Sequence, residues 1–480
     1  MSEIVRETGR ETARETGAPG LFDRALRRLA NVWRDMAAGV GGEDESVADV
    51  MRDCLEARGG EVSARARAAR LAETYLRLDQ AGRLDFLRVL AGFDSDVDAV
   101  ARAYEDVQSA PDAATRARAK AGLRRALEPP RVRLLAQFTT IPDGMKFLVD
   151  LRATLLDGME GDPLLTALEG DLKGLLMSWF DVGMLELVRI DWSSPASLLE
   201  KLVAYEAVHS IRSWSDLKNR LDSDRRCYAL FHPRMPGEPL IFVEVALTQG
   251  LAASVQKLLD KRAPVLDAKQ ADTAIFYSIS NCQRGLAGIS LGNFLIKRVV
   301  ELLAREFKLK QFSTLSPIPG FRRWLDKQVA AATAGEGAAL LSDEESAALR
   351  TAAPAEAPAC ETGAQALAAV LRHRGWQRDP AMLRAAEPVL MRLCARYLLV
   401  ESRGKRALDP VAHFHLSNGA RVERLNMLGD VSEKGVKESA TLMVNYLYDP
   451  ANIEDYHEAY AGEGKRTAST AVRRLARGWV

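Results

Sequence analysis

The 480-residue sequence predicts an α+β protein, in which an all-helical N-terminal domain is followed by a strand-rich domain that also contains helices. Two observations lead to this class. Up to about residue 190, apolar residues recur at helical spacing and no segment alternates as a strand does. Beyond that point, short runs of β-branched and aromatic residues, bounded by turn residues, follow one another between helical stretches. We place the helical domain at 1–190 and the second domain at 191–480.

Five helical stretches are predicted in the N-terminal domain, at 22–36, 71–78, 113–128, 145–156 and 162–180. The first has an apolar stripe that steps by four and three residues, made of Phe22, Leu26, Leu29, Trp33 and Met36. The third stops at Pro129-Pro130, as a helix must. None of the five carries a cluster of catalytic residue types. A bundle that packs or assembles subunits is therefore expected.

The second domain is predicted to open with a helix, because Ser194 is a good N-cap and Pro195 suits a first helical turn. Its expected strands are 227–233, 240–248, 274–280, 311–316, 412–426 and 441–449, and its clearest helices are 290–307 and 381–399. The turn residues Pro236-Gly237-Glu238-Pro239 predict a hairpin between the first two strands. The Ala/Gly/Glu-rich residues near 330–360 are expected to form a flexible, exposed connection with at most one short helix.

Composition and charge limit the classes of function. Apolar residues make up 47% and charged residues 27%, as in an ordinary soluble protein. The 66 Lys and Arg nearly cancel the 65 Asp and Glu, which gives no electrostatic case for nucleic acid as the main partner. Five scattered cysteines without a C-x-x-C pair favour neither a disulfide framework nor a zinc ribbon. Without a long apolar run or a signal-peptide core, we expect no membrane partner and a cytoplasmic location.

The stretch from Gln283 to Asn293 carries two competing chemical signals. Gly288-Ile-Ser290-Leu-Gly292 spells G-x-S-x-G, the nucleophile elbow of α/β-hydrolases, whereas glycines before a helix are typical of phosphate-binding loops. Ser290 comes ten positions after Ser280, the end of the predicted strand, so it falls at the helix start rather than on a sharp turn. This spacing favours a phosphate-binding loop, to which Arg284 adds charge. Taken alone, the glycines fit a plain turn and helix cap about as well.

Three segments together resemble the malonyl-CoA decarboxylase family. They are AIFYSISNCQRGLAGISLGNFLIKRVVELLAREF, FSTLSPIPGFRRWL and DPVAHFHLSNGA, in the order in which the family has them. The resemblance implies a GNAT-like α/β catalytic domain with a mixed central sheet at 191–480 and a helical oligomerisation domain at 1–190. It also implies malonyl-CoA as substrate, acetyl-CoA as product, a place in fatty acid metabolism, and a homo-oligomer, a tetramer by the same resemblance.

The same resemblance assigns site residues. The catalytic pair falls on Ser316 of L-S-P-I-P-G-F and His415 of F-H-L-x-N-G-A, and Tyr448 of N-Y-x-Y is a weaker candidate. The family's malonyl-CoA-binding segment falls on Ala287, Gly288, Ile289, Ser290, Leu291, Gly292 and Asn293. The family carries Glu at the position of Ser290, so no carboxylate role is transferred there.

Decarboxylation of malonyl-CoA requires no cofactor, because the thioester carbonyl itself takes up the electrons and gives an enolate. The protein must orient the carboxylate, stabilise the oxyanion and deliver a proton to the α-carbon. Ser316 is expected to hold the carboxylate or relay the proton. His415, with an unperturbed pKa near 6.5, is expected to donate it.

Three alternatives stay open at this point. His413 and His415 form H-x-H, which on a strand places both side chains on one face and suggests a metal site. Zinc requires three or four ligands, and the other four histidines show no ligand spacing, so no metal is expected. The remaining alternatives are an acyl-CoA-dependent N-acyltransferase on the same scaffold and a non-catalytic acyl-CoA-binding regulator.

Overall fold

The computed structural model describes residues 31–37, 46–56, 60–336 and 340–478. The first part of the predicted helix at 22–36 lies outside these residues. The chain forms two compact units. The helical unit comprises the described residues up to Leu185 together with His232–Pro236 and Gln283–Ile289, and the remaining described residues form the sheet unit.

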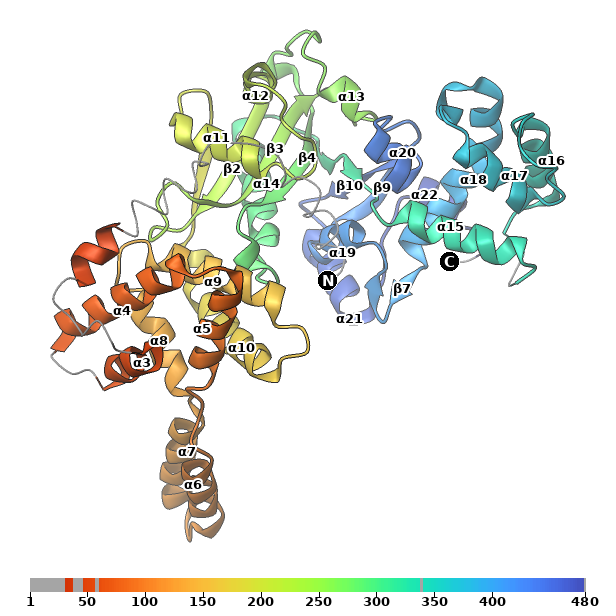
Figure 1. The fold of residues 1–480 in the computed structure, drawn as a ribbon. Coiled ribbons are helices and arrows are strands. Elements are labelled where there is room, and N and C mark those ends of the chain that lie inside the picture. Colours follow the sequence, from red (N-terminus) through yellow and green to blue (C-terminus); the bar gives the residue numbers. More distant parts are fainter. Residues whose placement is uncertain (1–30, 38–45, 57–59, 337–339, 479–480) are drawn as a thin grey trace. The chain divides into compact units, whose positions relative to one another are not determined.

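The helical unit is built from helices that pack on one another (Figure 1). Its elements are α3 (Val47–Leu55), α4 (Gly60–Arg77), α5 (Gln80–Ala91), α6 (Val97–Ser109), α7 (Ala113–Leu127), α8 (Pro130–Phe138), α9 (Gly144–Gly158), α10 (Pro163–Trp179), η1 (Val182–Met184) and η3 (Arg284–Leu286). Leucines on α5, α8, α9 and α10 are fully buried where these helices contact one another. The helices predicted within 71–78, 113–128, 145–156 and 162–180 are confirmed.

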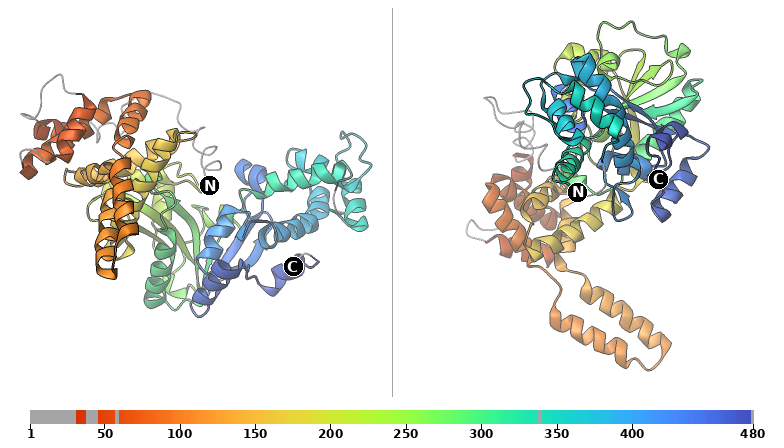
Figure 2. Two further views of the ribbon diagram at one scale, coloured as in Figure 1. Left: turned by 90° about the horizontal axis from the view of Figure 1, so that it is seen from below. Right: turned by 90° about the vertical axis from the view of Figure 1, so that its right-hand side faces the viewer.

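Helices α6 and α7 form a hairpin that projects from the rest of the helical unit (Figures 1 and 2). They pack on each other, and neither helix contains a buried residue. Asp96 and Asp112 cap their N-termini through backbone N–H groups. At the base of the hairpin, buried Arg131 pairs with Asp94 at 3.0 Å and Asp171 at 2.7 Å. The hairpin is thus held at its base. Along the rest of its length, α6 and α7 pack on each other and not on other helices of the described chain.

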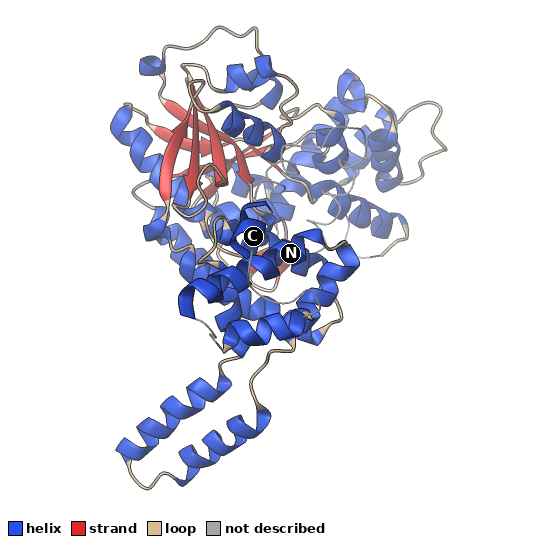
Figure 3. Ribbon diagram, turned by 60° about the vertical axis from the view of Figure 1, so that its left-hand side comes forward, coloured by secondary structure: helices blue, strands red, loops and turns tan. Residues whose placement is uncertain are grey.

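The sheet unit contains an eight-stranded mixed sheet in the described part of the chain (Figure 3). The strands are β1 (Glu186–Ile190), β2 (Arg225–Phe231), β3 (Pro239–Thr248), β4 (Thr273–Asn281), β5 (Gln311–Thr314), β6 (Ser316–Pro317), β9 (Arg421–Asn426) and β10 (Met443–Tyr448). Their order is β1-β2-β3-β4-β5-β10-β6, and β9 also pairs with β10. β4 and β5 are parallel, whereas the other pairs are antiparallel. The predicted hairpin of β2 and β3 is confirmed.

Helices surround this sheet, and a short ribbon of β7 (Ser402–Arg403) and β8 (Arg406–Ala407) lies apart from it. The helices are α11 (Ala196–Tyr205), α12 (Trp214–Arg220), α13 (Val255–Leu258), η2 (Ala268–Gln270), α14 (Gly292–Glu306), α15 (Phe321–Thr333), α16 (Asp343–Ala352), α17 (Gly363–Arg372), η4 (Trp376–Arg378), α18 (Pro380–Leu399), α19 (Pro410–Ser417), α20 (Glu433–Ser439), α21 (Ile453–Glu463) and α22 (Thr470–Leu475). Within the residues near 330–360, α16 packs on α17 and α18. No described helix is long and apolar enough to cross a membrane.

Two local predictions are wrong. The segment at 412–426 was expected to be one strand, but its first part belongs to α19 and only Arg421–Asn426 is a strand. The alternation in A-H-F-H-L resembles a strand, yet Asp409 caps α19 and Pro410 occupies its first turn. Ser194 does not cap α11, because Pro195 takes the N-cap position and the Ser194 hydroxyl accepts a hydrogen bond from the Asp191 N–H instead.

Candidate active site

Ser316 lies just beyond the end of β5, in the short strand β6. Strand β10 holds both pieces, since it pairs with β5 and then with β6, where Val444 lies opposite Ser316. The N–H of Leu315 donates to the Phe276 carbonyl of β4 at 3.0 Å. Ser316 is therefore fixed on both sides by backbone pairing, at the carboxyl end of the parallel β4–β5 pair.

The side chain of His415 meets Ser316 in the interior of the sheet unit. His415 Nε2 lies 3.1 Å from Ser316 Oγ, and Nδ1 lies 2.7 Å from the Tyr448 hydroxyl. The imidazole ring stacks on Tyr446 with 4.6 Å between ring centroids. Ser316, His415 and Tyr448 are 5%, 3% and 1% exposed. The structure thus brings together the predicted catalytic pair, Ser316 and His415, and the weaker site candidate Tyr448, and it removes all three from bulk water.

Hydrogen bonding in this group fixes where the protons lie. The Ser316 hydroxyl donates to Thr314 Oγ1 at 2.8 Å, so its oxygen is left as an acceptor for His415 Nε2–H. Nδ1 of His415 is then the acceptor for the Tyr448 hydroxyl. Burial lowers the pKa of His415 to about 3 and raises the pKa of Tyr448 well above its usual value. At neutral pH the imidazole and the phenol are both uncharged, and the expected unperturbed pKa near 6.5 is wrong.

His413 does not share a face with His415, as the H-x-H pattern on a strand would require. Two residues apart on a helix with 3.6 residues per turn, the two side chains point to different sides of α19. Nδ1 of His413 lies 2.8 Å from the Tyr460 hydroxyl, and His415 contacts Ser316 and Tyr448. Among the described residues, no group of three or more His, Cys, Asp or Glu side chains is placed to hold a metal ion.

One buried carboxylate, that of Asp409, ties together the two segments that carry the catalytic candidates. It accepts the N–H groups of Val411 at 3.0 Å and Ala412 at 2.8 Å, which caps α19. It also accepts the N–H of Gly320, four residues after Ser316, and lies 3.5 Å from the Tyr397 hydroxyl. Burial raises the pKa of Asp409 to about 6, while these backbone donors oppose the rise.

The glycine loop after β4 belongs to the helical unit. Arg152 of α9, only 1% exposed, donates to the carbonyls of Gly285 at 2.5 Å and Ala287 at 2.9 Å and pairs with Glu169 at 2.6 Å. A β-carbon on Gly285 would collide with the Val149 carbonyl, so only glycine allows this close approach. Gly288 has a φ of +77°, which glycine adopts without strain. The loop is consequently a rigid turn set by helix α9.

The residues predicted to bind phosphate differ in whether they have a charge or a hydrogen-bond donor that is not already used. Arg284 is engaged by Asp157 and by the Ala153 carbonyl, so its charge is already paired. Ser290 is exposed, and its hydroxyl contacts no acid or base in the described part of the chain, which is not the setting of an activated nucleophile. No side chain caps α14, whose first turn therefore presents free N–H groups. The other predicted binding residues in and after the loop are Ala287, Ile289, Leu291, Gly292 and Asn293.

The boundary between the units falls inside the predicted binding segment, between Ile289 and Ser290. On the sheet-unit side, α14 begins at Gly292, where a β-carbon would meet the ring of Phe414. Phe414 precedes His415 in α19, so the start of α14 lies against the helix that carries the candidate histidine His415. The close packing leaves no space for a side chain at Gly292.

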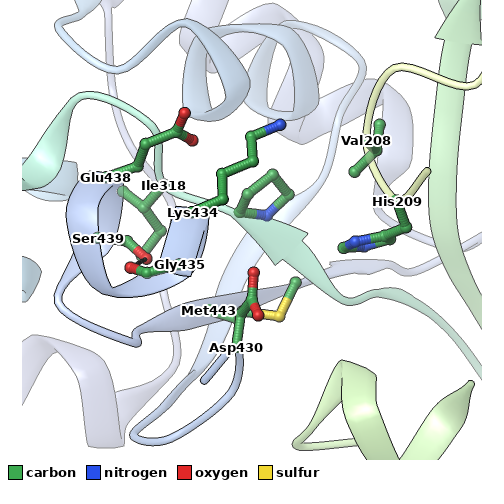
Figure 4. Close-up of a pocket in the computed structure, with 10 residues that line it drawn as sticks. Val208, His209, Ile318, Asp430, Lys434, Gly435, Glu438, Ser439 and Met443 are labelled. Carbon is green, nitrogen blue, oxygen red and sulfur yellow. Dashed lines mark hydrogen bonds between the residues drawn. The ribbon is translucent and has the colours of Figure 1, made fainter. Parts of the chain in front are cut away.

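A pocket lies beside the residue that follows Ser316 (Figure 4). Pro317 and Ile318 line it together with His209 and with Asp430 and Lys434 at the start of α20. Its volume of about 10 Å³ has room for roughly one water molecule.

Several residues of this site were not found from the sequence. They are Thr314, Asp409, Asn418 and Tyr446. Asp409-Pro410 is a helix-start signal that the sequence does contain, and it identifies the carboxylate that caps α19. Asn418 is 4% exposed, its side chain interacts with the Tyr448 hydroxyl, and its amide nitrogen has no further hydrogen-bond partner among the described residues. No local sequence pattern indicates that the side-chain amide of an asparagine will be buried beside the site in this way.

The strand order and the parallel pair β4–β5, whose strands are connected by the glycine loop and the long helix α14, define a GNAT-like catalytic fold preceded by a helical domain. Residues 93–180 match the malonyl-CoA decarboxylase N-terminal domain and residues 183–479 match the malonyl-CoA decarboxylase C-terminal domain. The chain belongs to the malonyl-CoA decarboxylase family.

Individual relatives agree with this assignment. Mouse "Malonyl-CoA decarboxylase, mitochondrial" is 40% identical over 84% of this chain and 82% of its own, and the goose (Anser anser anser) protein of the same name is 40% identical over 72% and 69%. The crystal structure of malonyl-CoA decarboxylase from Agrobacterium vitis matches with a TM-score of 0.80 at 41% identity, over 89% of this chain and 99% of that one. The enzyme from Rhodopseudomonas palustris gives 0.78 at 41% identity, over 89% and 98%.

Proposed function

We propose that this chain converts malonyl-CoA to acetyl-CoA and CO₂ at the buried group formed by Ser316, His415 and Tyr448. The observation that carries the proposal is the hydrogen-bonded series from Tyr448 through His415 to Ser316, closed off from water at the end of the parallel strands. Such a group can deliver a proton to a carbon atom without a charged side chain.

The reaction proceeds by loss of CO₂ first and protonation second. The bond between the α-carbon and the carboxylate breaks, CO₂ leaves, and the electron pair moves into the thioester carbonyl as an enolate. The Ser316 hydroxyl turns from Thr314 Oγ1 to the α-carbon and gives up its proton there, and His415 Nε2–H restores the Ser316 hydroxyl. The proton lost by His415 is replaced on its Nδ1 side through Tyr448 and finally from water, so one proton is consumed in each turnover.

A neutral His415 suits this chemistry. The enolate of a thioester is a strong base, so a neutral donor is acidic enough to protonate it. An imidazolium buried among Tyr446, Tyr448 and Ser316 would be costly because the site is desolvated. The low pKa of His415 therefore keeps the relay in the neutral form from which it acts.

The Asn418 amide, which lies beside Tyr448, is the proposed donor for the enolate oxygen. A preorganised donor in a buried site stabilises the developing oxyanion more than it stabilises the substrate. Asn418 lies three residues after His415, at the end of the same helix, so the donor and the proton relay are fixed relative to each other.

No cofactor is included in this mechanism. The thioester carbonyl is the electron sink, and the proton passes between oxygen, nitrogen and carbon without any change of redox state. Prolonged dialysis against a chelator is expected to leave the activity of the purified protein unchanged.

The decisive assay supplies malonyl-CoA alone. Acetyl-CoA and CO₂ are expected without any acyl acceptor, an outcome that an N-acyltransferase or a non-catalytic acyl-CoA regulator would not give.

His415→Asn tests the relay within this assay. It keeps a side chain of similar shape but cannot pass the proton, so kcat is expected to fall about 10²–10⁴-fold with a much smaller change in KM. His413→Asn is the matched control two positions away, and it is expected to cost far less, because His413 contacts Tyr460 rather than Ser316. Equal losses in the two variants would contradict the relay.

The assembly and location of the protein also remain proposals. We propose a homo-oligomer, a tetramer by family resemblance, assembled through the helical domain, which light scattering tests. We propose a cytoplasmic location and a role in fatty acid metabolism. The mouse and goose relatives carry "mitochondrial" in their names, so cell fractionation is the test of location.

A further inference from the structure

Lys173, on α10, points its ammonium group at the glycine loop. A β-carbon placed on Gly288 would lie 3.5 Å from Lys173 Nζ. Glu169, one helical turn earlier, is already paired with Arg152. Lys173 itself has no ion pair or hydrogen bond among the residues that the structure describes. An unpaired cation thus lies beside the one loop residue with a left-handed backbone.

The loop offers backbone donors at the same place. Within the described chain, the Gly288 N–H makes no hydrogen bond, whereas the N–H groups of Leu286, Ala287 and Ile289 are used inside the loop. A free backbone N–H on a glycine turn next to an ammonium group is the arrangement that binds phosphate oxygens. Arg284 does not serve this purpose, because Asp157 and the Ala153 carbonyl engage it.

We propose that Lys173, together with the free Gly288 N–H in the same unit, binds a phosphate group of the CoA moiety of the substrate. This inference rests on the proposed function, since it takes an acyl-CoA as the ligand. It gives the N-terminal helices a role in binding that does not depend on how subunits assemble.

The test compares two substrates. Lys173→Ala is expected to raise KM for malonyl-CoA roughly tenfold, the size of one charge-assisted hydrogen bond at a partly exposed position, and to leave kcat unchanged. Malonyl-pantetheine has the same thioester but no phosphate, so its KM is expected to be the same in the wild type and the variant. Lys173→Arg is expected to restore most of the affinity for malonyl-CoA. Lys120→Ala, which removes an exposed charge on α7, is the control and should change neither KM.

Two results would overturn the inference. One is an unchanged KM for malonyl-CoA in a folded Lys173→Ala variant. The other is an equal rise in KM for malonyl-pantetheine, which would point to a loosened loop rather than a lost phosphate contact. Calorimetric measurement of CoA binding to the same variants tests the contact between Lys173 and phosphate independently of turnover. If the wild type bound CoA but released no CO₂ from malonyl-CoA, the proposed function would fail, and the effect of Lys173→Ala on the affinity for CoA would still test the inference.

Discussion

At the scale of single residues, burial changes the chemistry that the sequence suggests. His415 was expected to act as a charged acid near neutral pH, but its surroundings of aromatic rings and hydroxyls lower its pKa to about 3. The Ser316–His415–Tyr448 contacts make a neutral relay instead. A residue type indicates which proton can move, whereas the folded environment decides the charge state from which it moves.

Asn418 gives a direct test of oxyanion stabilisation. Asn418→Asp replaces the amide nitrogen with an oxygen of nearly the same size, so the donor is lost and negative charge faces the enolate. We expect kcat to fall by about 10²–10³-fold or more, as for loss of one oxyanion-hole donor. Steady-state decarboxylation and the melting temperature are measured together. A normal kcat in this variant would rule out Asn418 as the donor.

Asp409 predicts an acidic limit to activity. With a pKa of about 6, its carboxylate is ionised at pH 7.5 and accepts the backbone donors that hold α19 and Gly320. As the pH falls through 6, protonation weakens these contacts and kcat is expected to fall. Asp409→Asn resembles the protonated form, so its kcat should be lower at pH 7.5 and nearly flat between pH 5 and 7.

The ionisation of Asp409 affects folding stability with a pH dependence opposite to its effect on kcat, and measuring the stability is the control for that experiment. The pKa of Asp409 is higher in the folded protein than the roughly 3.9 of an unfolded aspartate. Its contribution to stability is therefore fully present below about pH 4 and is lost as the pH rises through 6, at up to about 1.4 kcal/mol per pH unit. The melting temperature of the wild type minus that of Asp409→Asn should therefore fall between pH 4 and pH 6, because only the wild type loses the contribution of Asp409. A difference that is independent of pH would refute the raised pKa.

At the scale of elements, the α6–α7 hairpin stands out because it has no buried residue. Isolated helices of this length are marginal in water, and most helical stability comes from packing. Its many exposed positions include Val97 at 81%, Tyr104 at 54% and Leu127 at 51%. An element of this kind is suited to contact another copy of the chain, as the proposed oligomerisation role of the helical domain requires.

Replacing residues 96–128 with a short Gly/Ser linker tests the hairpin. The base, with Arg131 and Asp94, stays in place, so the helical core should keep its far-UV circular dichroism per residue and its cooperative unfolding. If the hairpin joins subunits, the mass measured by light scattering should drop to that of a smaller assembly. An unchanged number of subunits would assign assembly to another surface.

At the scale of the whole molecule, much of the fold follows from patterns that a sequence displays locally. The stripes of the N-terminal helices, the hairpin turn before β3 and the spacing of the glycine loop all appear in the described structure. The exception is α19, where alternating apolar residues favoured a strand and the Asp409-Pro410 start signal was overlooked. Ser316 and His415 were found through resemblance, since nothing in a one-dimensional pattern brings together residues that are 99 positions apart.

What could not be predicted depends on long-range packing. The charge of Arg284 is cancelled by Asp157 on a distant helix, and the free cation comes from Lys173, which has no motif around it. That the glycine loop packs within the helical unit is equally hard to predict from the sequence, because Arg152 is not distinguished from other charged residues there.

The attachment of the glycine loop to α9 has a consequence for how the enzyme fails on heating. The loop keeps its shape through Arg152 and the backbone of Val149, whereas Ser316 and His415 are held by the sheet unit. Warming that loosens the helices first would release the loop and leave the proton relay in place. Residual activity would then decline earlier at low malonyl-CoA than at saturating malonyl-CoA, so the apparent inactivation temperature would depend on the substrate concentration of the assay.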